Sequence, residues 1–163
     1  MRTSMRTIKH EIKWALVFML VTLAWMMIER ITGLHDRHIA QHAFYTNFFA
    51  VLAVLVYVLA LLDKRKNYYQ GYMSYSQGVK SGLLITLFIV LLSPLTQYLT
   101  HTLISPQYFS NIATCAVSIE QMTAAEAASY FSLQNYILLS MMMASVMGFV
   151  TTLIVALIVR RTP

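Results

Sequence analysis

The sequence predicts an all-α membrane protein with four transmembrane helices, and two observations carry this prediction. The first is a set of four long apolar stretches, at residues 12–31, 43–62, 75–103 and 136–159. A helix crosses the hydrocarbon core of a bilayer with about 20 mostly apolar residues, and each stretch is long enough. The second is composition, because 58% of the residues are hydrophobic and only 11% are charged, unlike a soluble domain. With their loops, the four spans occupy residues 1–163 as one integral membrane domain.

Positive charge is concentrated on one side of these predicted spans. Only Arg30 and Arg37 lie in or next to the first loop. The other ten Lys and Arg residues lie before or at the start of the first span, between the second span and the first turns of the third, or after the fourth. The positive-inside rule therefore predicts that both termini and the second loop are cytoplasmic. The net charge of +6 does not indicate a nucleic-acid partner, because no basic face with interleaved aromatic residues is present. The expected partner is the lipid bilayer.

The first span, residues 12–31, is predicted to be an uncleaved anchor. A basic start precedes an apolar run, as in a signal peptide, but the run continues into Glu29 and Arg30 without a small-x-small cleavage site. The single cysteine, Cys115, excludes an internal disulfide. We expect it to be a small packing residue.

The third span, residues 75–103, carries signals at its ends and in its interior. Ser74 and Gln77 have the spacing of a capping box at its start. Pro94 removes one backbone hydrogen bond and should kink the helix. After its end, Ser105 and Pro106 offer a new N-cap with proline at the first helical position.

The segment between the third and fourth spans, residues 105–134, is predicted to form a short helical outer cap. Apolar residues recur at helical spacing from Tyr108 to Ile119. Thr123 and Glu126 have the spacing of a second capping box. We expect two short helices on the outer surface, the second leading into the fourth span.

Small residues recur at every fourth position in the third and fourth spans. The clearest are Gly78, Gly82, Ala144, Gly148 and Thr152. Within lipid, helices associate through close backbone approach at small residues, so these positions predict a helix–helix seam. The spacing leaves open whether the seam lies within one chain or between two copies in a dimer.

Three polar side chains are predicted to lie at one depth in the outer leaflet. At a rise of 1.5 Å per residue, Glu29, Asn47 and Gln97 each lie about 24–25 Å from the charged residue at the cytoplasmic end of their span, which is Lys13, Asp63 or Lys80. His101 lies just above. Polar groups in hydrocarbon need partners. The layer is therefore either a structural hydrogen-bond network or a pocket for a ligand or ion.

The first outer loop contains His35, His38 and His42. If this loop is helical, the spacing i, i+3, i+7 places three imidazoles on one face, as in a zinc or copper site. No partner motif supports the spacing, so we expect solvated loop histidines and predict no cofactor, with a metal site as the alternative. Met143 and Met147, one turn apart, fit either Cu(I) passage or adaptable apolar packing.

Four segments together resemble a known family. They are Gly33-Leu34-His35-Asp36-Arg37-His38, residues 63–69, residues 71–78 and Ser93-Pro94-Leu95-Thr96-Gln97-Tyr98. They resemble the small bacterial membrane proteins grouped as domain of unknown function 4199, and the likeness covers most of the chain. The resemblance implies a four-helix protein of the bacterial cytoplasmic (inner) membrane and transfers no activity or catalytic residue.

The sequence contains no common enzyme signature. It has no Gly-rich phosphate loop, no nucleophile elbow and no metal-binding His pair with a Glu between, so we expect no enzymatic activity. The leading functional prediction is association, through helix packing, with itself or with a membrane partner. The alternative is a small-solute or ion transporter that works as a dimer through the outer-leaflet polar pocket, with Pro94 as a flexible break.

Overall fold

The structure is a computed structural model that describes the backbone of residues 2–162 and the side chains of residues 8–162. Its α-helices are α1 (Arg2–Ile31), α2 (Ile39–Tyr45), α3 (Phe49–Tyr68), α4 (Tyr75–Leu99), α5 (Tyr108–Ser118), α6 (Ala124–Tyr130) and α7 (Leu133–Val159). A 3-10 turn, η1 (Thr46–Phe48), joins α2 to α3, and a π-helical turn, η2 (Thr100–Ile104), follows α4.

Four stretches of the described residues are long and apolar enough to cross a membrane. They are Ile8–Ile31, Ile39–Tyr68, Tyr75–Ile104 and Leu133–Val159. The predicted fold class, all-helical with four candidate membrane-spanning helices, is confirmed. The second stretch is longer than the predicted 43–62, because α2, η1 and α3 follow one another without a break.

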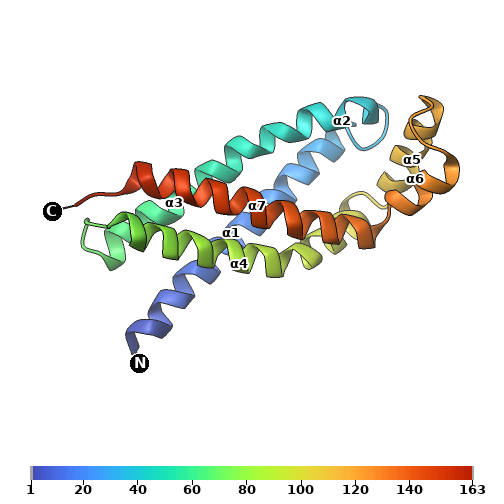
Figure 1. Cartoon of the computed structure of the whole chain (residues 1–163). Coiled ribbons are helices and arrows are strands. Elements are labelled where there is room, and N and C mark those ends of the chain that lie inside the picture. The colour runs from blue at the N-terminus through green and yellow to red at the C-terminus, as the bar shows by residue number, and fades with distance from the viewer. Residues whose placement is uncertain (1, 163) are drawn as a thin grey trace.

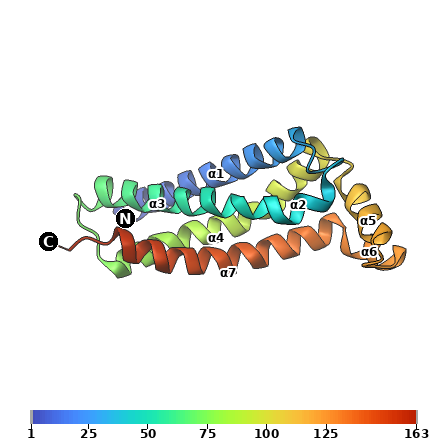
Figure 2. The ribbon, with the colours of Figure 1, turned by 90° about the horizontal axis from the view of Figure 1, so that it is seen from above.

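The long helices form an elongated bundle whose two ends differ (Figures 1 and 2). Helices α5 and α6 gather at one end, which we call the cap end. Both ends of the chain lie toward the other, together with the connection between α3 and α4. We call this the basic end, because Lys64, Arg65 and Arg161 belong to it. There an antiparallel bridge joins Met73 to Arg161 through two backbone hydrogen bonds of 2.9 Å.

Helices α4 and α7 lie side by side in both views (Figures 1 and 2), and small residues bring them together. A Cβ atom added at Gly78 would lie 3.1 Å from the Ala156 Cβ, and one at Gly82 would lie 2.5 Å from the Thr152 Cγ2. Ala144 packs against the same core. The small residues of both helices are therefore used within one chain, in a seam that only side chains of this size allow.

Gly148 allows a third helix to join this seam. A Cβ atom there would lie 2.5 Å from the Thr86 Cγ2 and 2.9 Å from the Tyr57 hydroxyl. The Tyr57 and Thr86 hydroxyls are hydrogen-bonded at 2.7 Å, and Thr86 also donates to the Gly82 carbonyl at 3.0 Å. Each buried hydroxyl in this layer thus has a partner, as polar groups in an apolar interior require.

The outer surface of the bundle is apolar along its length. Large hydrophobic side chains such as Leu20, Leu91, Met142 and Ile158 are all more than 60% exposed. A water-soluble monomer rarely exposes so much apolar surface. These faces fit a bilayer, in which lipid chains cover them.

Both predicted capping boxes are confirmed. The Ser74 hydroxyl accepts from the Gln77 N–H while the Gln77 side chain accepts from the Ser74 N–H, and Thr123 and Glu126 form the same pair at the start of α6. The predicted N-cap at Ser105 is wrong: α5 begins at Tyr108 after Gln107, without a side-chain cap. The Ser105 hydroxyl is instead hydrogen-bonded to a histidine.

The side of the membrane on which each end lies stays a prediction, and reporter fusions test it. A reporter at Lys66 and one at the C-terminus should both read cytoplasmic, because the basic end carries most of the Lys and Arg residues. A reporter at Glu120, in the loop between α5 and α6, should read outside. An outside signal at Lys66 would reverse the assignment.

Candidate functional site

A buried cluster of ionisable side chains lies at the cap end, where the chain leaves α1 and turns into α2. Gly33 makes the turn possible with a φ of +81°, a conformation that favours glycine. Residues 32–38 form consecutive turns rather than a helix. The exposed Asp36 carboxylate accepts from the Arg37 N–H at 2.5 Å and from Arg30 at 2.8 Å. The Arg37 N–H, and then the charges of Arg30 and Arg37, lower the pKa of Asp36.

Glu29, near the end of α1, is the centre of the cluster. Its side chain is 1% exposed. One carboxylate oxygen, Oε1, accepts a 2.6 Å hydrogen bond from the Trp25 indole N–H. The other, Oε2, lies 3.1 Å from His35 Nε2 and 3.3 Å from His42 Nε2. Two imidazoles from different segments thus approach the same carboxylate oxygen.

Hydroxyl groups hold the far nitrogens of both imidazoles. His35 Nδ1 lies 2.5 Å from the Ser105 Oγ, and His42 Nδ1 lies 3.3 Å from the Tyr108 Oη. Asn111 donates to the His35 carbonyl at 2.9 Å. Ser105, Tyr108 and Asn111 all belong to the start of the cap, so the cap fixes the orientation of both rings.

Tyr108 keeps its hydroxyl proton throughout the physiological pH range. Burial and the nearby Tyr136 hydroxyl, 3.4 Å away, raise the pKa of Tyr108 above its usual range. Its ring lies between three imidazoles, with ring centroids 5.1 Å from His35 and 5.2 Å from both His42 and His101. A neutral hydroxyl can donate to or accept from His42, so it accommodates either tautomer of that ring.

The polar layer predicted from the sequence is brought together only in part. Glu29 lies in the cluster. Gln97 and His101 pair with each other at 3.1 Å. The His101 ring contacts Phe109 and Tyr108, with centroids 4.1 and 5.2 Å apart, and is not among the groups that approach the Glu29 carboxylate at 3.3 Å or less. The placement of Asn47 was wrong. Its exposed side chain donates to the Ala43 carbonyl at 2.6 Å, one turn back on its own helix, because equal depth does not decide which way a side chain points.

The three loop histidines also separate. His35 and His42 meet, but His38 is exposed. The predicted spacing required a helix through all three, and the turn at Gly33 replaces it. Glu29 replaces His38 as the third potential ligand, because ligand atoms of Glu29, His35 and His42 all lie within 4.8 Å of one another. The sequence placed Glu29 and the histidines in two separate candidate sites, and the structure joins them.

A second buried ionic cluster, at the basic end, was missed. Lys64 donates to Glu11 Oε1 at 2.7 Å, and the Ser81 hydroxyl donates to the same oxygen at 2.7 Å. Both charged side chains are at most 1% exposed. The sequence analysis uses Lys64 only as one of the topology signals between the second and third spans. The signal in the sequence was Glu11, an acidic residue among basic residues at the start of the first span. The second span ends at the same side of the predicted bundle, next to Lys64.

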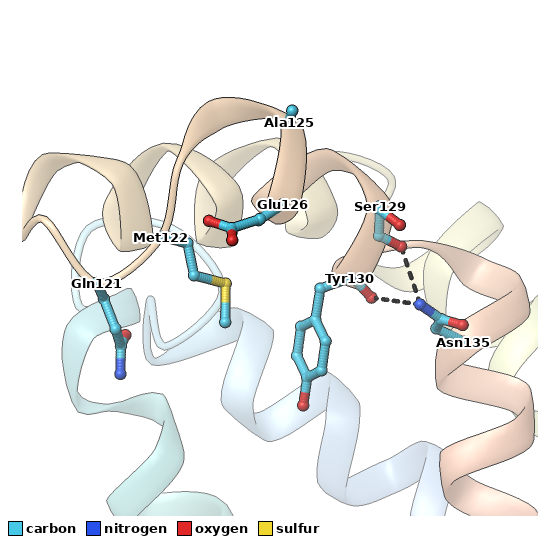
Figure 3. A pocket seen from close by; sticks show the side chains of 7 residues that line it. All are labelled: Gln121, Met122, Ala125, Glu126, Ser129, Tyr130 and Asn135. Atoms are coloured by element: carbon cyan, nitrogen blue, oxygen red, sulfur yellow. Dashed lines mark hydrogen bonds between the residues drawn. The ribbon is translucent and has the colours of Figure 1, made fainter.

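A pocket lies away from both clusters, at the cap (Figure 3). It has a volume of about 690 Å³ and is lined by Gln121, Met122, Ala125, Glu126, Ser129, Tyr130 and Asn135. Two of its polar side chains are engaged locally. Asn135 donates to the Ser129 carbonyl at 2.9 Å, and the Glu126 carboxylate accepts from Thr123 in the capping box. The Thr123 contacts lower the pKa of Glu126.

Comparison with known proteins gives one match. No curated protein and no solved structure matches the chain. A family model described as a protein of unknown function, DUF4199, matches residues 13–161. This range includes most of the first candidate span, all of the other three and the whole Glu29 cluster, whereas Glu11 of the second cluster precedes it. The chain therefore belongs to the DUF4199 family.

Proposed function

We propose that this membrane protein binds a divalent transition metal ion, zinc being the best fit, through Glu29, His35 and His42. The observation that supports this is the approach of two imidazole Nε2 atoms to one carboxylate oxygen, at 3.1 and 3.3 Å. Atoms bound to one tetrahedral zinc, each at about 2.0–2.1 Å, lie about 3.3–3.4 Å from one another. The two spacings to the carboxylate oxygen are therefore close to those around zinc, and all three ligand atoms lie within 4.8 Å of one another.

The surroundings of these donors also suit a metal. Ligating histidines are usually held through their second nitrogen, which fixes the ring and its tautomer. Ser105 and Tyr108 provide these contacts at the Nδ1 atoms of His35 and His42, so both Nε2 atoms can present lone pairs to the ion. Two neutral imidazoles and one carboxylate leave one positive charge on bound Zn²⁺, and a water or hydroxide completes the tetrahedron.

The proposal is for binding and not for catalysis. Glu29 and His35 are at most 2% exposed and His42 is 16% exposed, so the described side chains leave little access for a substrate. The metal would tie the end of α1 to α2, beneath a cap that already contacts both rings. Binding would therefore stabilise this end of the bundle, since an ion that binds only the folded state adds to its stability.

The experiment uses purified, chelator-treated protein in detergent and titrates Co²⁺ and Zn²⁺. We expect one Co²⁺ per chain with visible d–d absorption, displaced by Zn²⁺, and a higher melting temperature with Zn²⁺. Loss of a residue that only hydrogen-bonds a metal ligand weakens metal affinity by roughly 10–100-fold. His42→Ala removes a ligand itself, so it should weaken Zn²⁺ binding by more than this. His42 is the most exposed of the three ligands, so the variant should fold, and the melting temperature without metal checks this.

The matched control is His38→Ala, which removes an exposed histidine from the same turn. It should leave the affinity for Zn²⁺ unchanged. Equal weakening by both variants would show adventitious binding to surface histidines, and absence of stoichiometric Co²⁺ binding by the wild-type chain would overturn the proposal.

The two functions predicted from the sequence stay proposals of their own. Association with another copy or a membrane partner would need surfaces other than the α4–α7 seam, because the seam residues already pack within one chain. Transport through Glu29, Asn47 and Gln97 would need side chains that face one path, and Asn47 is hydrogen-bonded to its own helix. Metal binding draws the more direct support from the geometry.

A further inference from the structure

A pocket at the basic end is independent of the proposed metal site. It has a volume of about 330 Å³ and lies between α1 and α3, lined by Lys9, His10, Lys13, Asp63, Asn67 and Tyr68. Lys9 and Lys13 are near the start of the first candidate span, and Asn67 and Tyr68 end the second. The pocket therefore lies where the apolar spans stop, which in a bilayer is the level of the lipid headgroups.

The pocket is rich in hydrogen-bond donors. Lys13 is paired with Asp63 at 3.0 Å, and the Trp14 indole N–H donates to the same carboxylate oxygen at 2.7 Å. Asn67 occupies the other oxygen of Asp63. Because Asp63 is already engaged, the exposed Lys9 adds a positive charge that no partner among the described residues neutralises.

His10 is the unexplained group in this pocket. It is 3% exposed, and neither ring nitrogen makes a hydrogen bond among the described residues. Its Nε2 lies 3.3 Å from Asp63, an ion pair only if the ring is protonated. Its ring is otherwise held edge-on against Tyr68, with centroids 5.0 Å apart. Buried polar groups normally make hydrogen bonds. A buried imidazole without one, in the lining of a pocket, indicates a ligand that accepts a hydrogen bond from the ring N–H.

The surface next to the pocket is apolar and follows one face of α1. Ile12, Leu16 and Leu20 are 37%, 45% and 65% exposed, and their spacing of four residues places them in one row. A ligand with a phosphate at one end and a hydrocarbon chain at the other would cover both surfaces.

We propose that this pocket binds the phosphate of a phospholipid headgroup. The Lys9 ammonium and a His10 ring N–H contact the phosphate oxygens, and an acyl chain lies along Ile12, Leu16 and Leu20. Lys13 and Asp63 form part of the wall of the pocket. Their opposite charges cancel, so the net charge of the pocket comes from Lys9. A free phosphate could accept hydrogen bonds from Lys9 and His10, but it would make no contact with Ile12, Leu16 and Leu20.

The test uses delipidated protein in detergent and native mass spectrometry, with dioctanoyl phosphatidylglycerol as the probe. Dioctanoylglycerol, which lacks the phosphate, and inorganic phosphate are the comparison ligands. The wild-type chain should retain one phosphatidylglycerol with an affinity at least about 10-fold higher than for either comparison ligand. Loss of one charged phosphate contact, roughly 1.4 kcal/mol or more, corresponds to a 10-fold change.

Two variants separate the site from general attraction between a basic surface and an anion. Lys9→Gln removes an exposed charge, and His10→Phe keeps an aromatic ring against Tyr68 but removes both nitrogens. Each should weaken phosphatidylglycerol binding about 10-fold with an unchanged melting temperature. The matched control, Lys66→Gln, removes an exposed lysine of α3 that is not in the lining and should have no effect.

Three outcomes would overturn the proposal. A Lys66→Gln variant weakened as much as Lys9→Gln would show non-specific electrostatics. Inorganic phosphate that binds as tightly as phosphatidylglycerol would show a free-anion site instead of a lipid site. If the His10→Phe variant binds phosphatidylglycerol as tightly as the wild type, His10 does not contact the phosphate. None of these outcomes depends on the metal at Glu29, so failure of one proposal leaves the other intact.

Discussion

Lys64→Met should be among the most destabilising substitutions in this chain. It removes the ammonium group that donates to Glu11 at 2.7 Å. Among the described side chains, the buried carboxylate then keeps the Ser81 hydroxyl at 2.7 Å and His10 Nδ1 at 3.9 Å, without a lysine to balance its charge. Breaking a buried ion pair from one side typically costs about 3–5 kcal/mol, because the remaining charge is uncompensated. The free energy of unfolding, measured by SDS titration or by thermal melting in detergent, should fall accordingly.

Two further variants test the cause of this loss. Lys66→Met removes a lysine from the same helix whose side chain is exposed, and it should leave the melting temperature nearly unchanged. The double variant Glu11→Leu, Lys64→Met should regain much of the lost stability, since an apolar pair of similar volume leaves no buried charge. If the double variant is no more stable than Lys64→Met alone, the pair is not the source of the effect.

Gly148→Leu should also destabilise the protein strongly. Even a Cβ atom at this position would lie 2.5 Å from the Thr86 Cγ2 and 2.9 Å from the Tyr57 hydroxyl, so a leucine must push α7 away from both neighbours. Overpacking typically costs about 1–3 kcal/mol, and loss of the hydrogen bond between Tyr57 and Thr86 would add to this. The melting temperature in detergent should fall well below that of the wild type.

The control for this substitution is Ser145→Leu. Ser145 is exposed on α7, three residues from Gly148, and its hydroxyl bonds only to the Met141 carbonyl of its own helix. A leucine there adds the same bulk to a surface that suits lipid, so stability should change little. Equal melting temperatures for wild type and Gly148→Leu would mean that α7 does not pack against α3 and α4 as described.

The candidate site shows where prediction from the sequence stopped. Glu29 and the histidines were each recognised, since a carboxylate at membrane depth and three clustered imidazoles stand out by residue type. Their meeting depends on the turn at Gly33, which brings the chain back over the end of α1 so that His35 and His42 reach Glu29. The wrong assumption was a regular helix from His35 to His42, which would have kept His38 in the set.

The sequence by itself determined the helical class, the four candidate spans and the capping boxes, because these depend on local composition and on spacing along one helix. It also determined which residues are small enough to form a seam. Only the tertiary structure decided that Gly82 and Gly148 face partners within the same chain, that the Asn47 side chain is exposed, and that Glu11 pairs with Lys64 from another helix. These outcomes depend on the rotation of each helix about its axis. In lipid, apolar residues on all sides of a helix leave that rotation undetermined until the helices pack.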